Sequence, residues 1–470
     1  MLTRLRVKGF KSLEDVEVRF GPLTCIAGPN GVGKSNLFDA IQFLKLLSDQ
    51  PIIDAANSIR DAGGSRSNIA ALFTATVNHR AQIMEFEADM VVPGTVTDDF
   101  GREAKPKVTY LRYHLALKYV PGSSSNTESL DLVSESLTFI PKGVAPNTLG
   151  FNLSKGFFAS IYQGSSKNDF LYMDEKEPGV VNLRQDQTNG QPVGIPIGKA
   201  WRTVISHINT VDKPTALAAR REMQSWGFLK LEASSLREPD DFRAESMVSS
   251  TGRHLPAALD RINKSEAVAH RLATLLPDVA DVFVDADEKR QLKTLYLKTT
   301  SGMQYEARAL SEGTLRFLAL AIIAEDNKAG GLLCLEEPEN GIHPGRIDAV
   351  VELLHQMAVD PSYPVGDDNP LRQLIINTHS PLVVERLKLD QLVVSQPYRR
   401  DGASLSSFSG LLGTWRDGDA DAPPTSRPVG FGALMAYLVQ DDSFDESRPE
   451  SQNIRQEYLQ QVTMMDGGEK

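Results

Sequence analysis

Cysteine is scarce in this sequence: its 470 residues include only Cys25 and Cys334, and both lie within apolar runs. So few cysteines exclude a disulfide framework and a multi-cysteine zinc site, and they suit a reducing compartment. Long hydrophobic runs are absent as well, since none approaches the ~20 residues that cross a bilayer. The first residues, MLTRLRVKGF, lack the apolar core of a signal peptide. We therefore expect a cytoplasmic protein with no membrane contact.

The chain also lacks an excess of basic residues. Acidic residues outnumber basic ones by 61 to 50, for a formal net charge of -11. No positive field over the whole protein therefore attracts nucleic acid or an anionic membrane, and any nucleic-acid contact needs a local basic patch. With 41% hydrophobic and 24% charged residues the chain resembles a folded globular protein, and its length corresponds to about three domains.

The clearest motif is GPNGVGKS at residues 28–35, a full match to the phosphate-binding loop pattern GxxxxGK[ST]. It follows an apolar run at 22–27, typical of a buried strand, and leads into 35–49, where apolar residues recur at helical spacing. Glycines let backbone N–H groups converge on phosphate oxygens, and the helix N-terminus adds a positive dipole end. We expect Lys34 to reach the β- and γ-phosphates of a nucleotide and the Ser35 hydroxyl to bind Mg²⁺. A glycine turn without a ligand is the plainer alternative.

A second site lies in LLCLEEPENGIHP, where an apolar strand is expected at 332–335. Glu336 and Glu337 follow at its carboxyl end, where parallel sheets place ligand-binding groups. The sequence predicts that Glu336 holds Mg²⁺ and that Glu337 orients or deprotonates the attacking water. Adjacent acids on a solvated loop are common, so this prediction depends on the phosphate loop.

Residues 310–316, LSEGTLR, form a polar turn that leads directly into an apolar helix. The turn resembles the LSGGQ signature of ABC-type ATPases, in which a serine and backbone amides grip the γ-phosphate bound to the opposite protomer. The alternative is that Ser311 is an N-cap with no further role. Beyond the acids, His379 follows an apolar strand expected at 374–378, and it matches the switch histidine of ABC-type heads, which senses the γ-phosphate.

The spacing of these motifs predicts several structural units, because Lys34 and Glu336 lie far apart in the chain. No heptad pattern continues for long, so a long coiled coil is not expected. We expect the first part of a head at 1–92, a mainly antiparallel β lobe at 93–195, a helical insertion at 196–275, the second part of the head at 276–395, and a linker with a partly disordered tail at 396–470.

The motif order resembles that of ABC-type ATPase heads of the RecF/SMC/OLD group, and above all of stand-alone bacterial RecF/OLD-like ATPases. RLRVKGFKSLEDVEV and GPNGVGKSNLFDAIQFL resemble RecF and SMC heads, while LSEGTLRFLAL, LEEPENGIHP and INTHSPLVVE resemble the RecF/OLD-like proteins. The similarity covers about residues 1–92 and 250–395. It implies an α/β fold: an ABC-type P-loop ATPase head with a mixed or parallel core sheet, an antiparallel β lobe and a helical insertion.

The resemblance also implies an ATPase with ATP and Mg²⁺ as cofactors. Ser35 and Glu336 would hold the metal, Glu337 would be the hydrolytic base, and His379 the switch. Ser311 and Gly313 would reach the nucleotide of a second protomer in a homodimer. The phosphate-binding residues that it implies are Gly28, Pro29, Asn30, Gly31, Val32, Gly33, Lys34, Ser35 and Asn36.

The implied role is a motor or switch in DNA metabolism or anti-phage defence, acting with a separate effector protein, for which a nuclease is one candidate. One alternative is a nucleotide-gated scaffold with slow turnover that presents its middle lobe to a partner. Another is direct DNA clamping by Arg220, Arg221 and Lys230, for which a solvated face is the plainer explanation. Relatives of the OLD type carry a Toprim nuclease, but the DxD letters at 285–287 and 417–421 lie outside a suitable context. We predict no nuclease in this chain.

Overall fold

The computed structural model describes residues 1–59, 69–122, 128–186, 191–417 and 422–434. At its centre lies a six-stranded sheet in the order β12-β17-β18-β3-β19-β20. The strands from β12 to β19 run parallel, and β20 pairs antiparallel with β19. The strands are β3 (Leu23–Ala27), β12 (Gly227–Leu229), β17 (Gly331–Glu336), β18 (Arg372–Thr378), β19 (Leu392–Arg400) and β20 (Ala403–Ser409).

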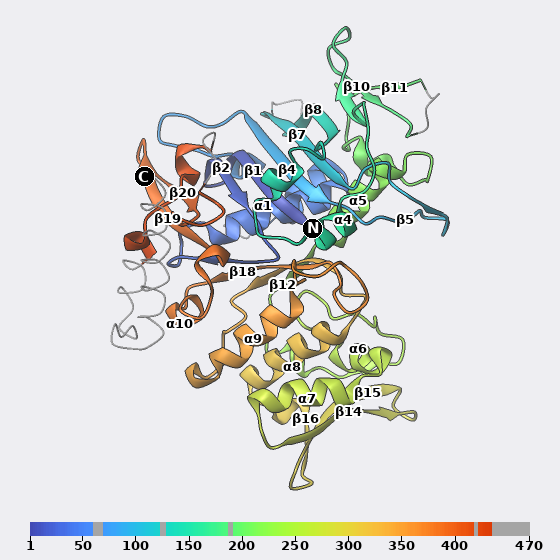
Figure 1. Ribbon diagram of the computed structural model, residues 1–470, viewed down its shortest axis with the longest axis vertical. Coiled ribbons are helices and arrows are strands. Elements are labelled where there is room, and N and C mark those ends of the chain that lie inside the picture. Colours follow the sequence, from blue (N-terminus) through green and yellow to red (C-terminus); the bar gives the residue numbers. More distant parts are fainter. Residues whose placement is uncertain (60–68, 123–127, 187–190, 418–421, 435–470) are drawn as a thin grey trace.

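Both faces of this central sheet are covered, as Figure 1 shows with α1 on one side and α8 and α9 on the other. Ile26 of β3 packs into one hydrophobic core, while its neighbours Cys25 and Ala27 pack into the second. Strands buried on both faces need apolar residues at every position, which explains the continuous apolar runs in the sequence. The parallel order brings the carboxyl ends of β3, β17 and β18 to one edge of the sheet.

An eight-stranded antiparallel sheet forms most of the upper part of the molecule in Figure 1, in the order β11-β10-β9-β8-β7-β4-β1-β2. Its inner face packs against α1 and encloses the first core. A separate two-stranded ribbon joins β5 (Val96–Thr97) and β6 (Glu103–Ala104). The eight strands are β1 (Leu2–Phe10), β2 (Leu13–Arg19), β4 (Ile83–Val91), β7 (Tyr110–Val120), β8 (Ser129–Phe139), β9 (Leu171–Met173), β10 (Val180–Leu183) and β11 (Val193–Pro196).

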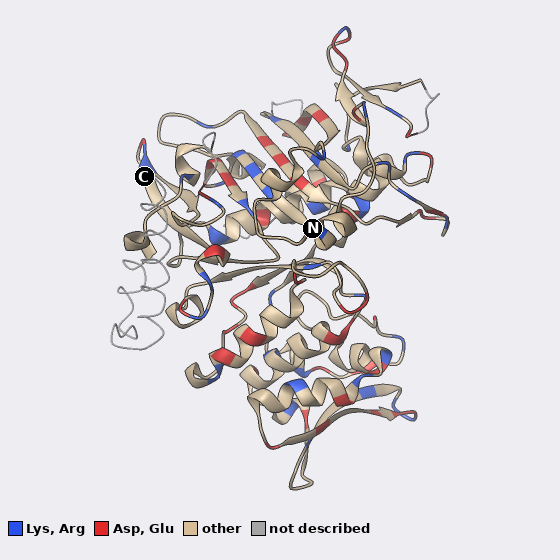
Figure 2. Cartoon of the chain, in the orientation of Figure 1, with Lys and Arg blue, Asp and Glu red and all other residues tan. Residues whose placement is uncertain are grey.

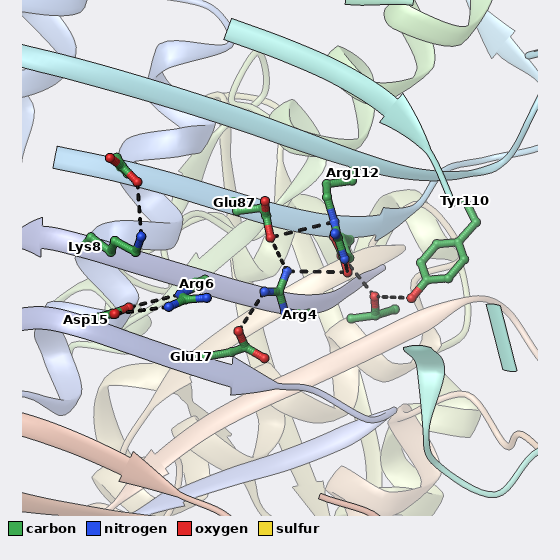
Figure 3. Close-up of polar contacts among 11 residues, drawn as sticks. Arg4, Arg6, Lys8, Asp15, Glu17, Glu87, Tyr110 and Arg112 are labelled. Atoms are coloured by element: carbon green, nitrogen blue, oxygen red, sulfur yellow. Dashed lines mark hydrogen bonds and ion pairs between the residues drawn. The ribbon is translucent and has the colours of Figure 1, made fainter. Parts of the chain in front are cut away.

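The other face of this sheet carries a network of charged side chains (Figure 3). The Arg4 guanidinium lies 2.7 Å from a carboxylate oxygen of Glu17 and 2.5 Å from one of Glu87, and that of Arg112 lies 2.7 Å from Asp89. Because side chains alternate along a strand, the pattern RLRVK directs its basic residues to this face and its apolar residues to the core. The cross-strand pairs then stabilise one register of the sheet.

The lower part in Figure 1 surrounds the second core with helices and a small sheet. In the small sheet β15 (Leu292–Thr299) pairs with β13 (Asp240–Asp241), β14 (Val279–Asp287) and β16 (Gln304–Glu306). The helices of the described chain are α1 (Lys34–Leu47), α2 (Ile52–Ser58), α3 (Ala145–Leu149), α4 (Lys155–Ile161), α5 (Pro214–Ser225), α6 (Leu255–Ile262), α7 (Ser265–Leu275), α8 (Glu312–Glu325), α9 (Ile347–Met357) and α10 (Pro381–Val384).

The expected α/β fold with a largely parallel core sheet is confirmed. The longest helices of the described residues, α1 and α8, have 14 residues each, and no long coiled coil is present in that part of the chain. None of the helices in the described ranges has the length and apolar character that would let it cross a membrane.

Some expected boundaries differ from the structure. The antiparallel sheet is not confined to 93–195, because β7 pairs with β4 and β4 pairs with β1. The segment 196–275 is not purely helical, because β12 belongs to the central sheet. Strands of one sheet come from distant parts of the chain, so a local change of composition does not mark where a structural unit ends.

The linker expected from residue 396 is the clearest difference. β19 continues to Arg400, and β20 runs back along it. The frequent Gly, Ser and Asp residues in this stretch suggest a linker, but β20 gains its backbone partners from β19 and buries Leu405 and Phe408. The part of the expected tail from residue 435 onward lies outside the described residues.

Candidate active site

The phosphate loop connects the end of β3 to the first residue of α1, the strand–loop–helix order that the sequence predicts. Gly31 and Gly33 adopt left-handed backbone conformations, with φ of 79° and 92°. A Cβ on Gly33 would lie 1.9 Å from the Ser406 hydroxyl, so this position requires glycine for two reasons. Lys34 is only 7% exposed, and its ammonium donates to the carbonyls of Gly28 and Pro29 at 2.6 and 2.8 Å. Burial lowers the pKa of Lys34.

The two acids lie at the carboxyl end of β17, beside the end of β18. The Glu337 backbone N–H donates to both the main-chain and the side-chain oxygen of Asn377, each at 3.1 Å. Glu337 has a φ of 46°, in the left-handed region that non-glycine residues rarely occupy. Its Oε1 lies 3.0 Å from Nδ1 of His379. The negative charge of Glu337 opposes the effect of burial on the pKa of Lys34 and favours the ionised form of Lys34. The pairing of β17 with β18 and of β18 with β3 places the acids, the histidine and the phosphate loop at one edge of the sheet.

Two residues that sequence reasoning missed support this arrangement. Asn377 holds the backbone of Glu337, as described above. Glu339 is 7% exposed and accepts a hydrogen bond from the Thr378 hydroxyl, which itself accepts one from the Ser380 N–H at 2.9 Å. These bonds join the loop after β17 to the loop after β18. In the sequence, Glu339 lies in PEN directly after the two acids, and Asn377 lies in INTHSP shortly before His379. Their positions inside these motifs were the only signal for a role.

The carboxylate of Glu339 bears on whether a cation fits this site. Its second carboxylate oxygen, Oε2, is buried with no hydrogen-bond partner among the described residues, and burial raises the pKa of the group. The charge of Glu339 also acts on Lys34. Ser35, the second residue of α1, and Glu336, the last residue of β17, carry the oxygen ligands that Mg²⁺ prefers. The donor set therefore fits a magnesium ion bound together with a nucleotide.

The signature-like turn lies at the start of α8, a helix of the lower part of Figure 1. Ser311 is the N-cap of α8: its hydroxyl accepts the N–H of Thr314 at 3.3 Å. The plainer interpretation of Ser311 is therefore satisfied within one chain, and a contact with a second protomer stays a prediction. Gly313 packs against the loop after β17, where an added Cβ would lie 2.4 Å from the carbonyl oxygen of Gly341.

Replacing Gly313 by alanine is expected to destabilise the protein by about 1–3 kcal/mol, because the added methyl group would clash with backbone that must then shift. Chemical denaturation of the full chain measures this loss. Gly330→Ala is the matched control, since nothing lies within 4 Å of a Cβ at that position. Equal stability of the two variants would show that the loop after β17 moves freely away from α8.

The structure contradicts a DNA clamp built from Arg220, Arg221 and Lys230. The Arg220 side chain is buried and donates to the carbonyls of Ser48 and Ile208 at 3.0 and 2.9 Å. Arg221 pairs with Asp99, and the Lys230 ammonium lies 3.5 Å from Glu336. The three residues do not form a basic surface, because Arg220 lies on the buried side of α5. Elsewhere Lys and Arg are interspersed with Asp and Glu over both parts of the molecule (Figure 2).

Two aspartates of the DxD-like sequences, Asp287 and Asp417, stabilise local turns in the structure. Asp287 ends β14 and accepts the N–H groups of Lys289 and Arg290 in the following turn. Asp417 accepts the N–H of Gly413 at 3.0 Å, and 418–421 lie outside the described residues. In the described ranges no group of three or more His, Cys, Asp or Glu side chains is arranged to hold a metal ion.

Two family models match the chain. The model described as "AAA domain, putative AbiEii toxin, Type IV TA system" matches residues 128–385, which is more than half of the chain. The model of the RecF/RecN/SMC N terminal domain matches residues 1–60 and so includes the phosphate loop.

Curated relatives match over short stretches. The OLD nuclease of Thermus scotoductus is 52% identical over 44 residues, which is 9% of this chain and 8% of that protein. The DNA repair protein RecN of Xylella fastidiosa is 34% identical over 84 residues, 18% of this chain and 14% of the relative. The RecF protein of Magnetococcus marinus is 52% identical over 44 residues, 9% of this chain and 12% of the relative. The matched stretches thus span less than a sixth of each relative.

Solved SMC heads have a loosely similar shape. An SMC head bound to the C-winged helix domain of ScpA aligns with 87% of this chain and 97% of its own, at 14% identity and a TM-score of 0.46. The SMC head domain from Thermotoga maritima aligns with 87% of this chain and 98% of its own, at 14% identity and a TM-score of 0.38. Likeness at these TM-scores carries no argument about function.

Proposed function

The chain belongs to the family described as "AAA domain, putative AbiEii toxin, Type IV TA system", and we propose from this premise that it hydrolyses ATP to drive a motor or switch. The observation that carries the proposal is the convergence of Lys34, Glu337 and His379 at the ends of three neighbouring strands. The RecF and RecN relatives bear DNA repair in their names, and the OLD relative is a nuclease. These names support a role in DNA metabolism. Anti-phage defence as the alternative role, and a separate effector protein, follow only from the resemblance to RecF/OLD-like ATPases.

Each residue of the site has a role in the proposed reaction. Apart from Pro29, which has no N–H, the backbone N–H groups of residues 28–36 would bind the phosphates. The Lys34 ammonium would join them once it leaves the carbonyls that hold it now. Ser35 and Glu336 would hold Mg²⁺, which neutralises charge on the phosphate oxygens. Glu337 would accept a proton from the attacking water through Oε2, because His379 engages its Oε1. His379 would then respond to the γ-phosphate through this same contact.

We further propose that two protomers close around two ATP molecules. As the resemblance to ABC-type heads implies, Ser311 and Gly313 at the start of α8 would serve the nucleotide of the other protomer. The positive dipole end of α8 would face the γ-phosphate. A cytoplasmic location belongs to the same proposal and is supported by the two free, buried thiols of Cys25 and Cys334.

Replacing Ser311 by aspartate tests the dimer. Aspartate is as good an N-cap as serine, so α8 should stay intact while the new charge repels a γ-phosphate. We expect the unaltered chain to dimerise with ATP and not with ADP, and we expect Ser311→Asp to weaken the ATP dimer by about tenfold or more. Sedimentation velocity measures both effects.

The matched control is Ser154→Asp at the N-cap of α4, where the hydroxyl accepts the Phe157 N–H. This variant should dimerise like the unaltered chain. Dimerisation of Ser311→Asp at unchanged affinity would remove Ser311 from the nucleotide sandwich.

A further inference from the structure

Lys230 stands beside the acid that is proposed to hold the metal. It is the first residue after β12, which runs parallel to β17 with Leu229 opposite Leu335. The same register brings Lys230 next to Glu336, and the ammonium lies 3.5 Å from Oε2 of that carboxylate. The backbone N–H of Lys230 donates to the Ser250 carbonyl at 2.8 Å, which anchors the segment that leads away from β12.

The two side chains differ in exposure. The Glu336 side chain is 14% exposed, whereas that of Lys230 is 60% exposed. The carboxylate is therefore largely shielded from solvent, and the lysine ammonium reaches it from the solvent side. Such a lysine can leave its partner at little cost, since an exposed ammonium is readily rehydrated.

The electrostatics of the site make this positive charge important. Glu336, Glu337 and Glu339 gather at the edge of the sheet where the phosphates of ATP would bind. Lys34 already faces the charges of Glu337 and Glu339. Without a metal, the negative charge of Glu336 would repel an entering triphosphate, and a nearby cation weakens that repulsion.

We propose that Lys230 takes the place of the metal charge at Glu336 until Mg²⁺ arrives. Lys230 is a positioning residue: it neutralises Glu336, lets ATP bind before the metal, and then yields the carboxylate to Mg²⁺. The proposal rests on the proposed function, because it assumes that ATP binds at this site. It assigns a role to a lysine that the sequence had offered only as part of a DNA clamp.

The test measures the affinity of the full chain for a fluorescent ATP analogue, in EDTA and in saturating Mg²⁺. Lys230→Met keeps the apolar stem and removes the charge. We expect it to bind the analogue about tenfold more weakly in EDTA and within about twofold of the unaltered chain in Mg²⁺, because the metal then neutralises Glu336. Adding Glu336→Gln to Lys230→Met should restore binding in EDTA, since the repelling charge is gone.

Two variants serve as controls. Lys8→Met removes an ammonium that also lies 3.5 Å from a carboxylate, that of Glu85, on the eight-stranded sheet. It should leave both affinities unchanged. Lys230→Arg keeps the charge and should retain binding in EDTA, which separates lost charge from lost folding.

The outcomes separate the two proposals. An equal loss in both buffers, or no loss in either, would overturn the role of Lys230 while leaving an ATP site in place. Failure of Glu336→Gln to restore binding in EDTA would overturn it as well. If the unaltered chain binds no nucleotide even in Mg²⁺, the proposed function and the inference built on it both fall.

Discussion

Replacing Glu337 by glutamine is expected to slow ATP hydrolysis by about 10²–10⁴-fold, the usual contribution of a general base. Glutamine has nearly the shape of glutamate but cannot accept a proton from water. The backbone of residue 337 should stay in place, because Asn377 binds the backbone N–H of Glu337 and not the Glu337 side chain. ATP should therefore still bind, and removing one negative charge should strengthen binding.

Steady-state phosphate release and analogue binding measure these two expectations on the same sample. Glu352→Gln is the control: Glu352 is an exposed acid on α9 that accepts a hydrogen bond from Gln356, far from the phosphate loop in sequence and outside the site. Hydrolysis by Glu337→Gln at the rate of the control would assign the base to another residue.

The same variant separates a motor from a nucleotide-gated scaffold. A motor that depends on turnover loses its biological activity when Glu337 is replaced, although it still binds ATP. A scaffold retains its partner and its activity, because it needs only the ATP-bound shape. Activity of the variant in cells, compared with Glu352→Gln, distinguishes the two.

Replacing Lys34 by methionine is expected to weaken ATP binding by about 100-fold or more, which is the usual cost of removing one partner of a buried charged pair. The Lys34 ammonium is buried, and two nearby acids favour its charged form. Without it, Glu337 and Glu339 would repel the phosphates, and the carbonyls of Gly28 and Pro29 would lose their donor.

Lys45→Met provides a close comparison on the same helix. Lys45 also donates to a carbonyl, that of Trp226 at 2.6 Å, and burial also lowers its pKa. Both variants should lose some stability, so thermal unfolding alone does not discriminate. Isothermal titration with ATP does: only Lys34→Met should lose affinity, and retained affinity would mean that the phosphates bind elsewhere.

The strand, loop and helix around the phosphate loop could be predicted from sequence because each depends on neighbours in the chain. The apolar run before Gly28, the glycines at positive φ and the apolar spacing of α1 are local signals. The strand that delivers Glu336 and Glu337 is local in the same sense. The roles of these residues stay predictions until nucleotide binding is measured.

Other features could not be predicted because they depend on contacts between distant segments. A serine-rich stretch becomes β20 only because β19 offers it a partner. Arg220 has an ordinary helical position, and only the packing of α5 against Ser48 and Ile208 shows that it points inward. Lys230 carries no motif, and its meaning comes from the strand beside it.

By itself the sequence determined which chemical groups this protein can present: a glycine loop with a lysine, a pair of acids and a histidine at strand ends. Tertiary structure decided which of them meet. The parallel order β12-β17-β18-β3 places Glu337, His379 and the phosphate loop at one edge, and it brings in Asn377, Glu339 and Lys230 as well. The reason is physical: a strand's residue pattern specifies its faces, whereas its neighbours depend on how the whole chain buries both sides of the sheet.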